Sequence, residues 1–395
     1  MPAWIRLSLG GAATLLVGMG IGRFSYTPLI PALIERGALS ADQAGYVGAF
    51  NLAGYLVGAL IAPRLRARFG EAPTLRAWLL VSLACLAASI VPWGFAWLAF
   101  WRFLVGVAVA VMMIYALAVV TRAAPPARLG AATGIVFTGV GAGILLAGTL
   151  VPWLLETSLA AAWAGLAVAG AAGVAVALWG WGAAGGKDPP APAATPSPPA
   201  ARLRLTVPVA ALIAAQTLFS LGLIPHSIYW VDYIVRGLGH PIAFGGLHWV
   251  LFGVGAVGGT YLWGRLADRI GFHAGLVLAF ASLAAAVALP VVVTAGWALV
   301  VSSLVVGAQP GFSAIIAGRT HQVVGAARMA RAWRLMALAA GVGQAAGGYA
   351  HVTLFSATGS YVALYFAGAA CMAVGGLVGL LIVTPRADPQ PARHT

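Results

Sequence analysis

The chain has 395 residues, of which 62% are hydrophobic and only 8% are charged, and its formal net charge is +14 at pH 7. A soluble domain carries about 25% charged residues, so this composition excludes a soluble globular protein and predicts a lipid bilayer as the surroundings of most of the chain. The basic residues lie in short segments between apolar runs, which favours membrane topology over nucleic-acid binding as the reason for the charge.

A membrane-spanning helix needs about 20 apolar residues, and the chain holds twelve runs of that kind. In the first half they cover about 7–34, 43–63, 75–94, 97–121, 129–152 and 159–182. In the second half they cover about 206–233, 242–265, 274–295, 297–318, 331–353 and 360–383. We therefore predict an all-α polytopic membrane protein with twelve transmembrane helices in two pseudo-symmetric six-helix bundles.

The predicted domains follow from a Pro/Ala-rich stretch between the sixth and seventh runs. They are a first bundle over 1–183, a linker over 184–205, a second bundle over 206–384 and a tail over 385–395. The halves also look like copies, because Pro63–Gly70 aligns with Gly264–Gly271 at a constant offset of 201 residues. Parallel repeats of this kind are typical of transporters built from two similar bundles.

The first run contains Arg23, about two thirds along its length and hence near the middle of the bilayer. A charge at that depth is costly and usually faces a water-filled cavity. If the helix is regular, Met19, Arg23 and Thr27 share one face, with Tyr26 beside them. The planar guanidinium suits a carboxylate or phosphate, so we predict that Arg23 and Tyr26 bind substrate. The alternative is a structural pairing of Arg23 with backbone carbonyls or a helix end.

Other polar groups in the apolar runs are candidates for the same pathway. Neutral candidates for substrate binding are Asn51, His226, Gln309 and Gln344. For each one alone, an interhelical hydrogen bond is the competing explanation. Tyr229 and Trp230, close to His226, either contact the ligand or belong to an interfacial aromatic belt.

Candidates for coupling to an ion are fewer, because acidic residues are scarce in the apolar runs. Arg102 lies near the start of the fourth run, and Asp232 lies toward the end of the seventh. The alternative for Arg102 is a side chain that extends to the membrane interface without a role in coupling. His226 is the best candidate for protonation. Three options stay open: a proton on His226, a proton on Asp232, or no proton coupling.

The distribution of basic residues predicts the orientation. Of 22 Lys and Arg residues, 18 fall at one side of the predicted topology, only Arg36 and Arg236 fall at the other, and Arg23 and Arg102 lie within segments. Cytoplasmic loops are the basic ones. We expect a multi-pass protein of the cell inner (cytoplasmic) membrane with both termini in the cytoplasm.

Twelve helices, a central linker and a repeated Gly-x-Leu-Ala-Asp-Arg-x-Gly motif resemble the major facilitator superfamily. The resemblance implies that the second copy is a conformational-switch loop of Gly264, Asp268, Arg269 and Gly271. It also implies that the first and seventh helices, which are equivalent in the two halves, both line the cavity, so His226 is expected to face Arg23. In the first copy Pro63 replaces the first glycine and Ala67 replaces the aspartate.

Two further patterns bear on the family. Arg102-Phe103-Leu104-Val105-Gly106 resembles the family's Arg-x-x-x-Gly pattern, which implies a coupling role for Arg102. The segment from Gly20 to Pro31 looks like the first helix of the YbfB/YjiJ-type branch, and 43–55 extends that similarity. The Gly-x-x-x-Gly-Pro motif associated with antiporters is absent from the fifth run, which leaves the direction of transport open.

These features predict a secondary active transporter that moves a small organic solute, anionic or zwitterionic, by alternating access, with protons as a candidate coupling ion. Multidrug-type efflux of amphipathic compounds is the alternative, and a polytopic membrane enzyme is the alternative from another class. The sequence shows no His/Glu/Asp cluster at ligand spacing and no phosphate-binding loop with Lys, so we expect no enzyme, no cofactor and no metal. We expect a monomer.

Overall fold

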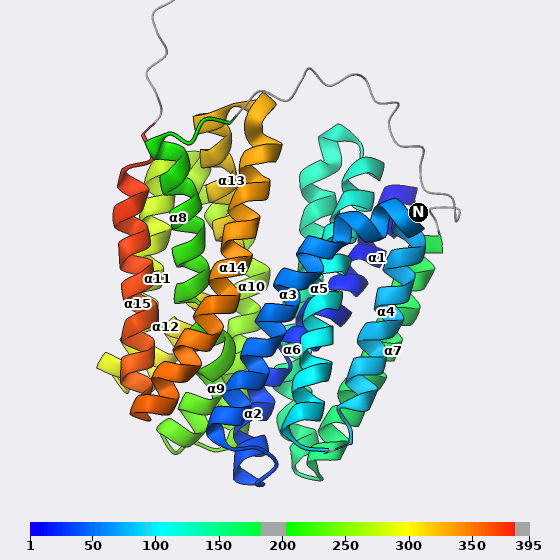
Figure 1. The fold of residues 1–395 in the computed structure, drawn as a ribbon, viewed down its shortest axis with the longest axis vertical. Coiled ribbons are helices and arrows are strands. Elements are labelled where there is room, and N and C mark those ends of the chain that lie inside the picture. Colours follow the sequence, from blue (N-terminus) through cyan, green and yellow to red (C-terminus); the bar gives the residue numbers. More distant parts are fainter. Residues whose placement is uncertain (92, 183–202, 384–395) are drawn as a thin grey trace, which may run out of the picture.

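The computed structural model describes residues 1–91, 93–182 and 203–383, which form helices joined by short connections (Figure 1). The helices of the first bundle are α1 Ala3–Leu15, η1 Leu16–Arg23, α2 Tyr26–Glu35, α3 Ala41–Phe69, α4 Glu71–Ala88, α5 Phe95–Ala123, η2 Pro126–Arg128, α6 Leu129–Leu155 and α7 Leu159–Trp181. Those of the second are α8 Val207–Gly222, η4 Pro225–Tyr229, α9 Trp230–Asp232, η5 Tyr233–Gly237, α10 Ile242–Ile270, α11 Phe272–Val292, α12 Gly296–Gly307, α13 Pro310–Val324, α14 Ala326–Thr358 and α15 Tyr361–Leu380.

Twelve spans result from these elements. In the described part of the chain, ten helical segments are long and apolar enough to cross a membrane, and the pair α12 and α13, bent by 44°, makes an eleventh. The twelfth is α14, whose hydropathy is lowered by Arg328, Arg331 and Arg334 in its first turns and by polar residues farther along, such as Gln344 and His351. The predicted fold class is confirmed. The predicted linker lies outside the described residues except for 203–205, and so does the predicted tail.

Local sequence signals set the helix ends. At Ser40, the side chain accepts a hydrogen bond from the Gln43 backbone N–H and the Gln43 side chain accepts one from the Ser40 backbone, a capping box that starts α3. The helix stops at Gly70, which has a φ of 78° that favours glycine. The second-half copy stops in the same way at Gly271, with a φ of 84°. The predicted switch loop is therefore mostly helical, since Gly264, Asp268 and Arg269 belong to α10 and Gly271 alone joins α10 to α11.

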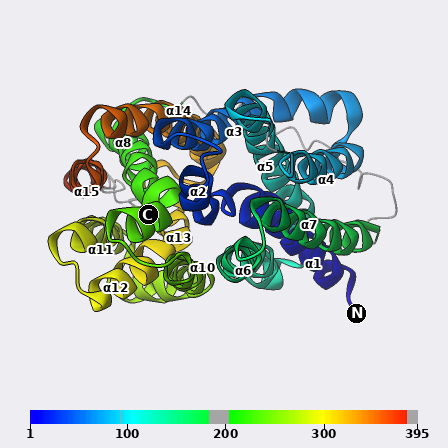
Figure 2. The same ribbon diagram turned by 90° about the horizontal axis from the view of Figure 1, so that it is seen from below.

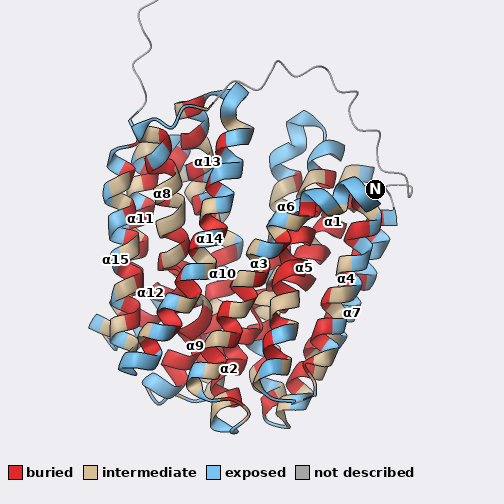
Figure 3. Cartoon of the chain, in the orientation of Figure 1, coloured by how far each residue is buried: buried red, intermediate tan, exposed pale blue. Residues whose placement is uncertain are grey.

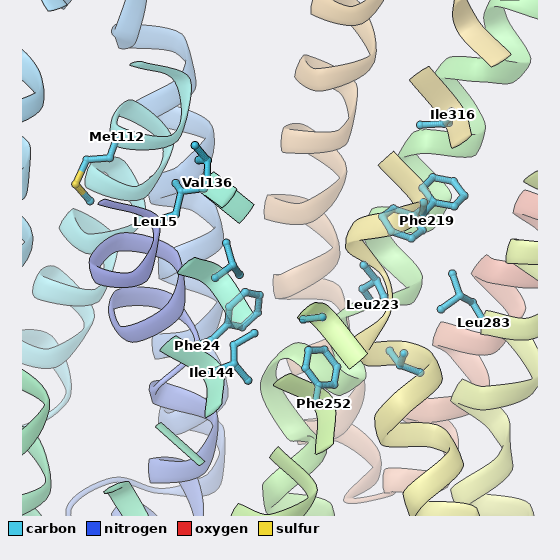
Figure 4. Close-up of a cluster of buried hydrophobic side chains, with 14 of the residues drawn as sticks. Leu15, Phe24, Met112, Val136, Ile144, Phe219, Leu223, Phe252, Leu283 and Ile316 are labelled. Carbon is cyan, nitrogen blue, oxygen red and sulfur yellow. The ribbon is translucent and has the colours of Figure 1, made fainter. Parts of the chain in front are cut away.

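The two bundles meet through two helix pairs, α3 with α14 and α6 with α10, and α2 lies between them (Figure 2). Glycines bring α6 and α10 together, because a Cβ on Gly148 would lie 2.8 Å from the Val250 backbone nitrogen and one on Gly246 would lie 2.7 Å from the Gly148 carbonyl oxygen. Figure 4 shows buried side chains of both bundles, with Phe24 and Phe252 near the junction.

The same helix pairs diverge at one end of the molecule. We call the end where Phe69, Leu129 and Ile270 lie the basic end, and the other the opposite end. At the basic end a Cβ added to Gly130 or Gly134 of α6, or to Gly258 or Gly264 of α10, would meet nothing within 4 Å. Gly130 is exposed and the other three glycines are partly exposed, and Figure 3 shows exposed surface at this end of α6. The bundles are thus packed together toward the opposite end and separate toward the basic end (Figure 1).

Candidate functional site

The first span is interrupted where Arg23 lies. Residues Leu16–Arg23 form a π-helix, in which the Phe24 backbone N–H donates to the Met19 carbonyl at 3.1 Å. Phe24 and Ser25 then form a turn before α2 begins at Tyr26. The expectation of one regular helical face through Met19, Arg23 and Thr27 is therefore wrong. A π-helical turn inserted in a helix is frequent at functional sites.

The Arg23 side chain reaches from the first bundle to the second. Its Nη2 donates to Oε1 of Gln344 on α14 at 3.2 Å. The guanidinium also lies over the ring of Tyr55 on α3, 5.6 Å from the ring centroid, and 5.4 Å from that of Phe24. The side chain is partly exposed. Two residues predicted to bind substrate, Arg23 and Gln344, are thus brought together across the junction of the bundles.

Arg102 on α5 supports this break in the first span. Its Nη2 donates to the carbonyl oxygen of Arg23 at 2.9 Å, and its guanidinium lies 4.9 Å from the centroid of the Tyr26 ring. The Asn51 side chain holds α5 in turn, because its Nδ2 donates to the Arg102 carbonyl at 2.9 Å. The Tyr26 hydroxyl donates to the Ala44 carbonyl at 2.9 Å. Of the residues predicted from the sequence, Arg102 thus bonds the Arg23 backbone directly, while Tyr26 and Asn51 contact Arg102.

Neither arginine is neutralised by a residue that the structure describes. In the described part of the chain no ion pair involves Arg23 or Arg102. Arg102 is only 1% exposed, and its Nε and Nη1 are buried without a hydrogen-bond partner within the same residues. A guanidinium stays protonated in proteins, so two positive charges lie inside the first bundle. Two of the Arg102 nitrogens remain available to donate hydrogen bonds.

His226 lies inside the second bundle, with its ring bonded to α12 and no described contact with Arg23. The hydroxyl of Ser302 donates to the Ala286 carbonyl at 2.7 Å, and the His226 Nε2 lies 2.8 Å from the same hydroxyl oxygen. Because the single hydroxyl proton is used on Ala286, the Nε2–H of His226 is the donor. The ring stacks on Trp230 at 4.5 Å between centroids and has no exposed surface.

The neighbours of His226 differ in where they point. Trp230 is fully buried and its Nε1 donates to the Ser303 hydroxyl at 3.2 Å. That serine occupies the second-half position equivalent to Arg102, and it also lies 3.1 Å from Nδ1 of His248. Tyr229 instead faces the other bundle, since its hydroxyl lies 2.5 Å from where a Cβ on Gly45 would be. The belt alternative is wrong for these two buried aromatic residues.

Asp232 is a carboxylate inside the second bundle. Its Oδ2 accepts a hydrogen bond of 2.5 Å from the Tyr361 hydroxyl of α15, and both oxygens lie 3.4 Å from Nη1 of Arg236. It is 1% exposed and lies between the π-helical segments η4 and η5. The carboxylate therefore joins the seventh span to the twelfth, and it does not contact the arginines of the first bundle.

Three residues predicted to take part in binding or in the conformational switch lie away from Arg23. Gln309 is partly exposed at the break between α12 and α13. Asp268 and Arg269 are exposed at the basic end of α10. No described hydrogen bond joins any of the three to Arg23.

Sequence reasoning did not single out Tyr55 or Glu71. The Tyr55 ring under Arg23 lies on the second span, and its spacing from Asn51, four residues along a helix, could have indicated a shared face. Glu71 is 3% exposed and pairs with Arg66 at 2.9 Å and with Arg122 at the end of α5. Its carboxylate pairs with Arg66, the residue before Ala67, which replaces the aspartate of the motif.

The two cavities described in the structure lie away from Arg23. A cavity of about 330 Å³ opens at the opposite end between α2, α4 and α7, and one of about 310 Å³ opens at the basic end beside α8. Arg23 lines neither. Within the described ranges, no group of three or more His, Cys, Asp or Glu side chains is placed to hold a metal ion.

Comparisons with known proteins agree with this architecture. The sequence profile of a family described as "Uncharacterised MFS-type transporter YbfB" matches residues 15–380. Among solved structures, the crystal structure of a D-xylose-proton symporter is similar with a TM-score of 0.71 and 15% sequence identity, covering 95% of this chain and 96% of the other. Many other solved chains also match. No curated protein matches the sequence significantly.

Proposed function

The chain belongs to the YbfB-type family of major facilitator superfamily transporters, and from that premise we propose that it carries a small organic anion across the cytoplasmic membrane by alternating access. Membership and fold make it a membrane transport protein of the secondary type. The substrate, the orientation in the membrane and the coupling ion are the proposed parts. We propose no catalytic role.

The main support for an anionic substrate is that Arg23 and Arg102 form no ion pair with the described residues. Arg23 offers a partly exposed guanidinium at the junction of the bundles, and Arg102 holds its backbone while adding a second positive charge. A carboxylate bound between Arg23 and Gln344 would gain charge-assisted hydrogen bonds in a medium of low dielectric. Among the described residues no carboxylate contacts Arg23, Tyr55 or Gln344, so the site offers a positive charge for a negative group and no negative charge for an ammonium.

The contacts between the bundles support alternating access. On α3 and α14 the bonded pairs are Asp42 with Ser356, 2.7 Å apart, and Tyr46 with Thr353, 3.4 Å apart. Both pairs lie toward the opposite end, and the helices diverge toward the basic end. Because basic loops are cytoplasmic, we propose that both termini are in the cytoplasm and that this conformation opens inward.

Aromatic rings near Arg23 suit an organic body on that anion. Phe24 packs against Trp249 of the second bundle with ring centroids 6.1 Å apart, and the Tyr55 ring also lies next to the guanidinium. An amphipathic anion would use both features. The multidrug alternative differs in predicting that uncharged amphipathic compounds bind as well.

A ligand-induced thermal-shift screen of the purified protein tests the proposal. Organic acids are expected to raise the melting temperature, because a ligand that binds the folded state stabilises it by mass action. Amines and neutral amphipathic compounds of similar size serve as comparison sets. Stabilisation by neutral amphipathic compounds as strong as that by acids would favour the multidrug alternative, and conversion of a hit into a product would favour an enzyme.

We further propose that Asp232 carries a coupling proton. Protonation would remove its charge beside Arg236 and change its bond to Tyr361, and so alter the tie between the seventh and twelfth spans. In proteoliposomes, a pH gradient is expected to accelerate net uptake by the wild type. Asp232→Asn is expected to lose that acceleration while substrate exchange at equal pH continues. A pH-gradient response that persists in Asp232→Asn would contradict this role, and His226→Gln, examined in parallel, would show whether the response belongs to His226 instead.

A further inference from the structure

A second basic site lies at the surface of the second bundle. A cavity of about 310 Å³ at the basic end is lined by Leu203, Arg204, Thr206, Val209, Val323, Val324 and Arg328. It is bounded by the start of α8, the end of α13 and the start of α14. Its volume falls within the range of cavities that hold small ligands.

The floor of this cavity is apolar and its charged groups are cations. Val209 and Val324 are buried and pack with Ala332 in a small cluster of their own. Arg204 and Arg328 are exposed. Within the part of the chain that the structure describes, neither side chain has an ion pair or hydrogen bond. Two cations beside an apolar floor fit a ligand with a negative group joined to a hydrocarbon body.

The position of the cavity relative to the bilayer indicates that its ligand is a lipid. It lies where the seventh and eleventh spans begin and the tenth ends, which is the headgroup depth of a bilayer. Beside it, Leu205 is 71% exposed and Val207 is 68% exposed, so apolar side chains next to the arginines are available to acyl chains. Basic pockets between transmembrane helices are places where anionic lipid headgroups bind.

We infer that this cavity binds the phosphate of an anionic phospholipid, with Arg204 and Arg328 as the phosphate ligands and the floor of Val209 and Val324 against the glycerol and upper acyl region. This site is separate from Arg23 and does not depend on which solute is transported. A free phosphate ion shares the charge but would leave the apolar floor uncovered.

The test measures lipid binding by the full-length protein in detergent, by thermal shift and by native mass spectrometry. The probes are dioleoyl phosphatidylglycerol, dioleoyl phosphatidylcholine and inorganic phosphate. Phosphatidylglycerol is expected to stabilise the wild type and to remain bound in the gas phase. The double variant Arg204→Gln/Arg328→Gln is expected to bind it about 10- to 30-fold more weakly, since each basic residue contributes to the attraction.

The control is Arg76→Gln/Arg128→Gln, which removes the same charge from exposed residues at the basic end of the first bundle. It is expected to keep wild-type phosphatidylglycerol binding. Equal weakening in the control would mean general surface attraction, and equal stabilisation by phosphatidylcholine or by inorganic phosphate would mean that the cavity does not select an anionic lipid. Each of these results overturns the inference. The melting temperatures without lipid show whether both double variants fold.

Discussion

Replacing Arg23 with glutamine is expected to weaken the binding of an anionic ligand by about 10- to 100-fold, because a hydrogen bond to a charged group contributes about 1.5–3 kcal/mol. The glutamine keeps a donor near Gln344 but loses the charge at the junction of the bundles. The melting temperature without ligand is expected to change little or to rise, since the variant removes an unneutralised charge from the membrane. Thermal shift against ligand concentration gives both quantities.

The matched control is Arg36→Gln, which removes the same charge from the end of the same span, where the side chain is exposed and bonded to the Leu155 carbonyl. It is expected to bind the ligand as the wild type does. Arg23→Lys should recover part of the affinity, because it restores the charge without the planar pair of donors. If Arg23→Gln and Arg36→Gln bind the anion equally well, Arg23 does not contact the substrate.

A disulfide between Asp42→Cys and Ser356→Cys is expected to abolish transport. In the wild type these side chains are 2.7 Å apart, on α3 and α14, and join the bundles at the opposite end. A covalent bond there would hold that end closed, so that the binding site could open only toward the basic end. The measurement is substrate flux in proteoliposomes after oxidation, with the fraction of cross-linked protein determined on a gel.

The background for this experiment is Cys85→Ser/Cys371→Ser, since both native cysteines are free. Each single cysteine variant with oxidant is the control, and a reductant should restore flux to the double variant. Substrate binding should survive the cross-link, because Arg23 lies away from the bonded pair. Undiminished flux through fully cross-linked protein would show that the bundles do not move apart at this end.

The sequence predicts the frame of this protein well, because spans in lipid are long, apolar and bounded by charge. All twelve predicted runs overlap observed helices, although the third extends past the end of α4 at Ala88 and the ninth past the end of α11 at Val292. The aligned glycines Gly70 and Gly271 end α3 and α10 in the same way. The resemblance to the YbfB-type branch is confirmed by the match over residues 15–380. The apolar composition therefore predicts the spans, and the internal repeat predicts that the two halves have matching helix ends.

The site is predicted less completely, for a reason visible at Arg23. Its depth in the first span follows from counting residues, and its pairing with Gln344 joins two residues that each stand out as polar groups in apolar runs. The face that it occupies does not follow, because the π-helix Leu16–Arg23 changes the angular position of each residue after it. The same limit applies to His226, whose span contains two π-helical segments and which turns toward Ser302.

The central claim is that Arg23, partly exposed at the junction of the bundles, selects a negatively charged solute. It is tested most directly with one carbon skeleton presented to the wild-type protein as a carboxylate, as the corresponding amide and as the corresponding amine, each titrated by isothermal calorimetry. The skeleton is that of the organic acid that raises the melting temperature most in the thermal-shift screen. We predict that the carboxylate binds at least about 10-fold more tightly than the amide and that the amine does not bind. Equal affinity for the carboxylate and the amine would contradict the claim.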